Sequence, residues 1–235
     1  DIDNLFVPSD EVICRAIFHR CRKKNKSVNL YLIDDGTGTY NSYTFRRGNI
    51  IGSIFYSLLL DSEYKRAFTA VYCYRPDLIN NSPKYIEFRR LISSENVREL
   101  FSEYVSNKID IYHGKKLIFL DQGFGGCPKV KESLEVIKKY FKQEDILVKK
   151  HPRVVSNDYQ GFPISNDGLP FEAIVSACHF NDCLIITHSS GGALNPFLIY
   201  GERPNVVLLS KISTDNSKFD IQYNNFYERV KNLMG

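Results

Sequence analysis

The sequence has no tryptophan, a single methionine and no CxxC motif. Without that spacing, its six cysteines offer neither the usual ligand pattern of a zinc site nor a redox pair. Most of them lie inside apolar runs, which favours reduced core residues of a cytosolic protein over a disulfide framework. The longest apolar run, residues 50–60, is about half the roughly 20 residues that a membrane-spanning helix needs.

Charge is spread along the chain apart from one basic cluster. The net charge is only +4, and no block of like charge is long. The cluster consists of Arg20, Arg22, Lys23, Lys24 and Lys26 and falls at the end of a predicted helix, where cations stabilise the helix dipole. An alternative use of the cluster is a patch for an anionic membrane or for nucleic acid.

Apolar runs of strand length alternate with segments of helical spacing. The length of 235 residues suffices for one large domain or two small ones. Strands are predicted at residues 5–7, 28–33, 70–74, 117–120, 146–148, 183–186 and 206–209. Helices are predicted from Asp10 onward and at residues 50–60, 85–105, 128–141, 171–178, 193–200 and 217–234. This alternation favours an α/β fold with parallel strands covered on both faces. A Gly-rich turn is predicted at residues 36–39 and a hinge at residues 106–115.

Three polar turns follow predicted strands, where open α/β sheets bind their ligands. They are Asp34-Asp35-Gly36 after residues 30–33, His151-Pro152 after residues 146–148, and Ser189-Ser190-Gly191-Gly192 after residues 184–186. Carboxylates, an imidazole, and hydroxyls beside backbone N–H groups together suit group transfer from a phosphate-bearing donor.

The acidic pair Asp34 and Asp35 has three interpretations. A carboxylate ahead of Gly36 projects from a tight turn and suits a general base that deprotonates a hydroxyl nucleophile. Paired acids also suit a divalent cation. The tripeptide is equally common turn chemistry, so the residues alone leave the three interpretations open.

The other polar residues have structural alternatives as well. His151, with Lys149 nearby, suits a proton donor to a leaving phosphate, or it is a surface turn in a basic loop. Ser189 and Ser190 suit an anion site at a helix start, or an ordinary N-cap. Glu172 suits a ligand of ribose hydroxyls, or a favourable acid in the first turn of a helix.

The order of these motifs resembles that of the bacterial sialyltransferases. The acidic-acidic-Gly strand end is followed by Lys-x-His-Pro, then by Glu172, then by Ser-Ser. Residues 31–40 have the sequence Tyr-Leu-Ile-Asp-Asp-Gly-Thr-Gly-Thr-Tyr. This sequence is most similar to the lipooligosaccharide and capsule sialyltransferase group, glycosyltransferase family 52. The similarity covers most of the chain and is strongest in these short segments.

The resemblance implies a GT-B architecture, in which two Rossmann-like domains face a cleft. Residues 1–106 would form a partial N-terminal, acceptor-side domain, and residues 107–235 a C-terminal nucleotide-sugar-binding domain. Rossmann-like halves usually contain several βα units, so we expect the first domain to be truncated, with its upstream part missing before Asp1. Two copies could complete it by exchanging elements in a homodimer.

The resemblance also implies the reaction and its participants. Sialic acid would pass from CMP-sialic acid, with inversion and without a metal or further cofactor, to a surface-glycan acceptor in lipooligosaccharide or capsule. The acceptor group would be a terminal galactose or another sialic acid. The enzyme would act in the cytoplasm at the inner face of the cell membrane, with peripheral membrane association and no nucleic-acid partner.

Each candidate residue takes a role from the resemblance. His151 would be the acid that faces the CMP phosphate, and Ser189 and Ser190 would hold that phosphate. Glu172 would bind the ribose, and Lys149 would lie near the cytosine.

The base is open between two turns. Asp34 or Asp35 would take the proton of the acceptor hydroxyl. Asp121, which follows residues 117–120, is a competing candidate. Two other functions also stay open: a non-catalytic module that binds CMP or a nucleotide sugar, and a glycosyltransferase with another nucleotide-sugar donor.

Overall fold

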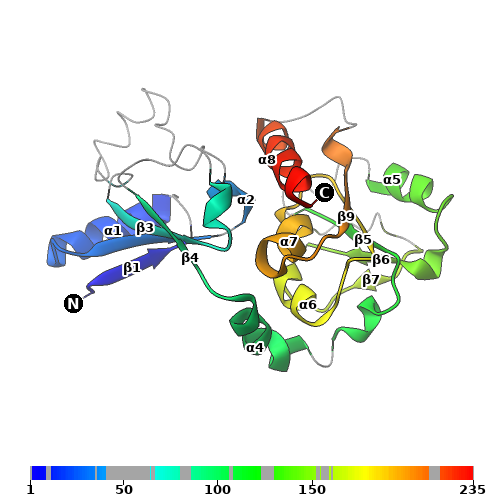
Figure 1. Cartoon of the computed structure of the whole chain (residues 1–235), viewed down its shortest axis with the longest axis horizontal. Helices are drawn as coiled ribbons and strands as arrows, with labels where there is room; N and C mark the ends of the chain where they lie inside the picture. The colour runs from blue at the N-terminus through cyan, green and yellow to red at the C-terminus, as the bar shows by residue number, and fades with distance from the viewer. Residues whose placement is uncertain are drawn as a thin grey trace. The chain divides into compact units, whose positions relative to one another are not determined.

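The structure is a computed structural model of the chain, which divides into two compact units, each with its own parallel sheet (Figure 1). Unit 1 is Asp1–Ile92 and unit 2 is Ser93–Gly235. The residues that the structure describes are 2–8, 12–34, 36–40, 64, 67–79, 86–105, 108–122, 130–151, 154, 159, 161–211 and 218–234. The parallel sheets confirm the predicted α/β class.

Unit 1 contains a four-stranded sheet in the order β1-β2-β3-β4, with every pair parallel. Its strands are β1 (Asn4–Val7), β2 (Asn29–Ile33), β3 (Phe68–Cys73) and β4 (Glu87–Arg90). Its described helices are α1 (Val12–Lys24), α2 (Thr37–Tyr40) and a 3-10 turn at Pro76–Leu78. Alternate residues of β2 point to opposite faces, and Leu30 and Leu32 are buried with Phe18 of α1 in one core.

Unit 2 contains a five-stranded sheet in the order β7-β6-β5-β8-β9, again with every pair parallel. Its strands are β5 (Leu117–Leu120), β6 (Ile146–Lys149), β7 (Ile164–Ser165), β8 (Leu184–Thr187) and β9 (Asn205–Leu208). Its α-helices are α4 (Ser94–Val105), α5 (Val130–Ile137), α6 (Phe171–Ala177), α7 (Asn195–Tyr200) and α8 (Lys218–Met234). Short 3-10 helices lie at Asp110–Tyr112, Gln143–Asp145, Gly191–Leu194 and Leu209–Lys211.

Two apolar clusters fill the opposite faces of the second sheet. Ile118 of β5 packs with Ile174 of α6 on one face, and Phe119 of β5 packs with Leu134 of α5 on the other. Because β5 and β6 are buried on both faces, β5 and the first three residues of β6 are continuous apolar runs in the sequence. Their carboxyl ends are thereby fixed at the centre of the sheet edge.

The helix predicted at residues 85–105 is wrong in its first part. Glu87–Arg90 is a strand that pairs in parallel with β3, and Phe88 packs on the core of unit 1. The helix α4 follows and packs against α6 of unit 2, where Arg98 donates a hydrogen bond to the carbonyl of Ser176 at 3.0 Å. The units therefore divide ahead of α4, whereas the sequence placed the hinge after it.

Two other local predictions differ from the structure. Residues 37–40 form the short helix α2 instead of a simple turn, and Thr39 N–H bonds the carbonyl of Gly36 just before it. The helix predicted at residues 193–200 is a 3-10 turn followed by α7. The predicted helix at residues 50–60 lies outside the described residues.

The membrane-spanning potential of the described helices is low. None of the helices in the part of the chain that the structure describes is both long and apolar enough to cross a bilayer.

The GT-B arrangement, the truncation of the first domain and the roles of the two domains stay predictions.

Candidate functional site

Three of the predicted site turns follow neighbouring strands of unit 2. Leu120 pairs with Lys149 on one side and with Thr187 on the other, so β6, β5 and β8 end together. The turn that begins at Asp121 therefore lies between the loop of His151 and the Ser-Ser turn. This edge is where an open parallel sheet binds its ligand.

Two hydrogen bonds join these turns. Ser189 donates its hydroxyl to Oε1 of Gln122 at 2.8 Å, and the N–H of Asp121 donates to the carbonyl of Lys149 at 3.1 Å. The first bond couples the turn after β8 to the turn after β5, and the second couples β5 to β6. The strand ends therefore hold each other in a fixed arrangement.

Ser190 is not an ordinary N-cap. It precedes the 3-10 helix Gly191–Leu194, yet its hydroxyl makes no capping hydrogen bond to that helix. Its N–H donates to Oγ1 of Thr187 at 3.1 Å, and its carbonyl accepts from the hydroxyl of Tyr223 at 2.6 Å. Both backbone polar groups of Ser190 are thus hydrogen-bonded, which fixes the position of its Cα and Cβ atoms. The side-chain hydroxyl itself has no capping role.

Asp121 lies inside unit 2 and is only 3% exposed. Its Oδ1 accepts from the N–H of Gln122 at 2.9 Å, and its Oδ2 accepts from the hydroxyl of Tyr159. Both carboxylate oxygens are therefore engaged by protein donors. This burial restricts the approach of a sugar hydroxyl to the carboxylate.

Lys149 forms a buried ion pair. Its Nζ lies 2.7 Å from Oδ1 of Asp167, and the two side chains are 8% and 6% exposed. Asp167 also accepts from the hydroxyl of Tyr112 at 2.6 Å, from the N–H of Leu169 at 2.7 Å and from the hydroxyl of Ser165. The ammonium of Lys149 therefore supports the end of β6.

The same contacts set the charge state of Asp167. Burial raises the pKa of this carboxyl, but the hydrogen bonds from Lys149, Tyr112 and Leu169 outweigh it and hold the pKa below its usual value. Tyr112 responds in the opposite sense, because burial and the Asp167 carboxylate raise the pKa of its hydroxyl. Asp167 is therefore a carboxylate at neutral pH, and Tyr112 keeps its proton.

His151 follows β6 by two residues and is half-buried. Its carbonyl accepts from the N–H of Val154 at 3.0 Å, which closes a turn at the strand end. Pro152 and Arg153 lie outside the described residues. The described geometry places the imidazole on the loop that borders Asp121.

Glu172 lies in the first turn of α6 and is half-buried. Its Oε1 accepts from Nδ2 of Asn195, and its carbonyl accepts from the hydroxyl of Tyr200 at 3.3 Å. Both partners belong to α7, the helix that follows the Ser-Ser turn. The structure thus connects Glu172 to the helix that follows the turn of Ser189 and Ser190.

Asp34 lies in unit 1, at the carboxyl end of β2, and is half-buried. Its Oδ1 accepts from the N–H of Gly36 at 2.9 Å. Its Oδ2 accepts from the hydroxyl of Tyr40 at 2.5 Å and from the N–H of Tyr74 at 3.3 Å. Asp35 lies outside the described residues.

The electrostatics of this turn suit a proton acceptor. Burial raises the pKa of Asp34, and hydrogen bonds led by that of Tyr40 oppose the rise without cancelling it. Burial and the charges of Asp34 and Asp77 raise the pKa of Cys73 to about 12. The guanidinium of Arg75 forms an ion pair with the carboxylate of Asp77 at 2.6 Å. A carboxylate with a raised pKa is a stronger base than an ordinary one.

The sequence interpretation missed Tyr40, Gln122, Asn195 and Asp167. Gln122 follows the strand end at Asp121, so the rule that selected the other turns also points to it. The partners of Tyr40, Asn195 and Asp167 are set by folding, and no spacing rule reveals them.

The described residues contain no cluster of side chains suited to binding a metal ion. Across the described residues, no three His, Cys, Asp or Glu side chains gather as metal ligands do. The expected absence of a metal requirement stays a prediction.

Comparison with known families identifies the chain. The model of the alpha-2,8-polysialyltransferase (POLYST) family matches residues 2–186, which is well over half of the sequence. The matched stretch contains Asp34, Asp121, His151 and Glu172 and ends three residues before Ser189. Comparison with curated proteins gave no match. The expectation of a sialyltransferase is confirmed, and membership of glycosyltransferase family 52 stays a prediction. The chain belongs to the alpha-2,8-polysialyltransferase family and is a sialyltransferase.

Proposed function

We propose that the protein transfers sialic acid from CMP-sialic acid to a hydroxyl of a glycan acceptor, with inversion at the anomeric carbon and without a metal ion. The observation that carries this proposal is the family match, whose span includes both the Asp34 turn and the His151 loop. The α-2,8 linkage in the family's name supports a terminal sialic acid as the acceptor group, ahead of galactose.

In the proposed reaction, Asp34 takes the proton of the acceptor hydroxyl. The acceptor oxygen forms a bond to the anomeric carbon, while the bond from that carbon to the phosphate oxygen of CMP breaks. The electron pair of the broken bond goes to the phosphate, which gains negative charge. His151 donates a proton or hydrogen bond to it, and Ser189 and Ser190 donate their hydroxyls.

The choice of Asp34 over Asp121 as the base is supported by access, and the raised pKa of Asp34 suits a proton acceptor. Asp34 is half-buried and its pKa is raised, whereas Asp121 is almost completely buried beneath its own hydrogen bonds. Asp35 shares the turn and stays a candidate. A base must reach the substrate hydroxyl before its basicity is useful, so access ranks first.

The donor's phosphate requires a change at Ser189. In the structure its hydroxyl hydrogen points to Oε1 of Gln122. A serine hydroxyl has one hydrogen to donate, so binding of phosphate reverses this bond, with the Gln122 amide turning to donate to Ser189. Glu172 and Asn195 are proposed to bind the ribose, and Lys149 to support the cytosine side of the site.

The proposed roles fall on both units. Unit 1 supplies the base through Asp34, and unit 2 supplies the donor-side groups through His151 and the Ser-Ser turn. We place this reaction in the cytoplasm, where the nucleotide-activated donor would be supplied.

A transfer assay tests the proposed function. The full protein is incubated with CMP-sialic acid and a fluorescent α-2,8-linked sialic acid oligomer, and the products are separated by chromatography. We expect elongation with release of CMP, unchanged by a chelator. Calorimetric binding of CMP without elongation or donor hydrolysis would instead indicate a nucleotide-binding module, and a thermal shift specific to UDP or GDP would indicate another donor.

A further inference from the structure

Helix α1 carries an exposed stripe that the transfer reaction does not use. Ile13, Ile17, Arg20 and Lys24 recur at intervals of three or four residues, so they lie along one face of the helix. Ile13 is 69% exposed and Ile17 is 47% exposed. The opposite face packs into the core of unit 1 through Phe18. The stripe is apolar toward the start of α1 and basic toward its end.

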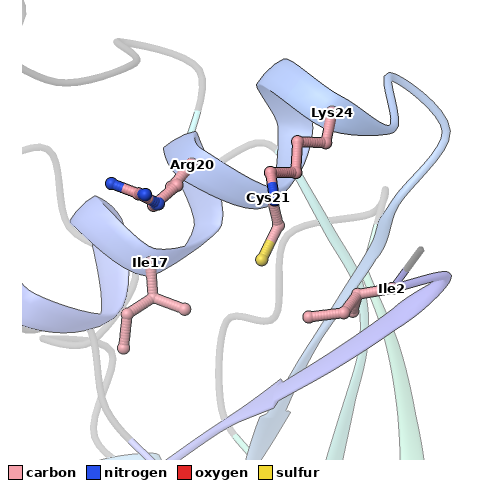
Figure 2. A pocket seen from close by; sticks show the side chains of 5 residues that line it. All are labelled: Ile2, Ile17, Arg20, Cys21 and Lys24. Carbon is pink, nitrogen blue, oxygen red and sulfur yellow. The ribbon is translucent and has the colours of Figure 1, made fainter.

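A pocket of about 310 Å³ lies beside this stripe. Its lining residues are Ile2, Ile17, Arg20, Cys21 and Lys24. Figure 2 shows Ile17 and Cys21 extending from α1 on the side where Ile2, which precedes β1, lies. Ile2 is itself 51% exposed. Aliphatic groups thus form the apolar part of the pocket, and two cationic side chains border it.

The charge of this segment has one sign. Residues 12–26 contain six lysines and arginines and no aspartate or glutamate. They are Arg15, Arg20, Arg22, Lys23, Lys24 and Lys26. Cations in the last turn stabilise the helix dipole, but the dipole explains neither the basic residues elsewhere in the segment nor the exposed isoleucines beside them.

We infer that the face of α1 formed by Ile13, Ile17, Arg20 and Lys24, together with Ile2, docks on an anionic phospholipid surface. The isoleucines would enter the boundary between headgroups and acyl chains, while the long basic side chains would pair with lipid phosphates. A basic amphipathic helix is typical of attachment to the membrane surface. A soluble polyanion such as a nucleic acid or an acidic glycan would pair with the cations but leave the isoleucines in water.

This inference rests on unit 1 alone and does not depend on which carboxylate is the base. Its test is co-sedimentation of the full protein with vesicles of phosphatidylcholine, either alone or with about a third phosphatidylglycerol. We expect binding to the anionic vesicles only, weakening as salt is added. Arg20→Ala with Lys24→Ala should weaken that binding at least about tenfold. Ile13→Ser with Ile17→Ser should weaken it as well, because apolar insertion is part of the proposed contact.

Helix α8 offers a matched control. Ile221 is 53% exposed and Lys231 is exposed near its end, so Ile221→Ser with Lys231→Ala changes the same residue types on another helix. This variant should sediment like the wild type. The inference fails if the wild type does not bind anionic vesicles at low salt. It also fails if the Ile13 and Ile17 substitutions leave binding intact, a result that would assign α1 to a soluble polyanion.

Discussion

The hydroxyl of Tyr40 donates a hydrogen bond to Oδ2 of Asp34 across 2.5 Å. The same phenolic oxygen accepts from the N–H of Arg75 at 3.2 Å. Helix α2 therefore returns the chain onto the carboxylate that follows β2, and the segment after β3 fixes the phenol through Arg75. Tyr40 is buried, so its contribution is to hold and polarise Asp34 from inside unit 1.

Asp34→Asn tests the first of the three candidate bases. The amide keeps the size of the side chain but cannot accept a proton, so transfer should fall by roughly 10²–10⁴ if Asp34 is the base. Affinity for CMP, measured by calorimetry, should change little. Asp121→Asn is the matched variant and should retain most activity. The opposite pattern, with loss only in Asp121→Asn, would move the base to unit 2, and loss only in Asp35→Asn would move it by one residue.

Tyr40→Phe should change the pH dependence of transfer. Burial already raises the pKa of Asp34, and the Tyr40 hydrogen bond opposes that rise. Removing the hydroxyl therefore raises the pKa further, and a base is active only above its pKa. The acidic limb of the pH–rate profile should move to higher pH.

A buried tyrosine in unit 2 controls for general loss of packing. Tyr227 is buried and donates to the carbonyl of Val206 at 2.7 Å, so Tyr227→Phe removes a comparable hydroxyl far from Asp34 in sequence. Its pH profile should match the wild type. The ionisable neighbours Cys73, Arg75 and Asp77 are unchanged in both variants. An unshifted profile for Tyr40→Phe, with Asp34→Asn inactive, would leave the base in place and remove the role of Tyr40.

The elements that the sequence predicts best are the central strands of unit 2. β5 and the first three residues of β6 are continuous apolar runs, because both of their faces are buried. In contrast, Glu87–Arg90 has no strand-like alternation of its own and becomes β4 by pairing with β3. Propensity is a weak guide where tertiary pairing decides the conformation.

The same limit applies to the candidate site. The strand-end rule selects Asp34, Asp121 and the Ser-Ser turn, since parallel strands end at one edge of their sheet. It cannot reveal that Lys149 pairs with Asp167, because the two residues are 18 positions apart in the sequence. Contacts of this kind depend on the path of the loop, which local pattern does not determine.

Ser189→Ala with Ser190→Ala should weaken CMP binding more than it lowers stability. Loss of the Ser189 bond to Gln122 should cost about 1 kcal/mol of unfolding free energy. Ser190 makes no capping bond, so its hydroxyl adds little to helix stability. Ser102→Ala on α4 is a control that removes an exposed serine hydroxyl bonded to a backbone carbonyl. Unchanged CMP affinity in calorimetry would return the Ser pair to a structural role.

Asp167→Ala should be strongly destabilising. It leaves the buried ammonium of Lys149 without its partner, a change that typically costs about 3–5 kcal/mol of unfolding free energy. The more exposed pair of Lys116 and Asp145 is the comparison, and Asp145→Ala should cost at most about 1 kcal/mol.

The destabilisation by Asp167→Ala should also depend on pH. The folded pKa of Asp167 lies below its ordinary value, so the stabilisation is present above the unfolded pKa and is lost as pH falls through the folded one. Urea unfolding at several pH values measures this. Equal costs for Asp167→Ala and Asp145→Ala at neutral pH would show that the buried ion pair does not support the end of β6.

His151→Ala should reduce transfer while leaving the fold intact. The side chain lies on a loop after β6 and is half-buried, so its removal affects little core packing. As the group proposed to face the leaving phosphate, it should contribute about 2–4 kcal/mol of transition-state stabilisation, and the loss should appear in kcat. His113→Ala removes an exposed imidazole elsewhere in unit 2 and should leave kcat unchanged. If the purified His151 variant turns over like the wild type, the phosphate is protonated or stabilised by another group, and the Ser-Ser turn becomes the first place to look.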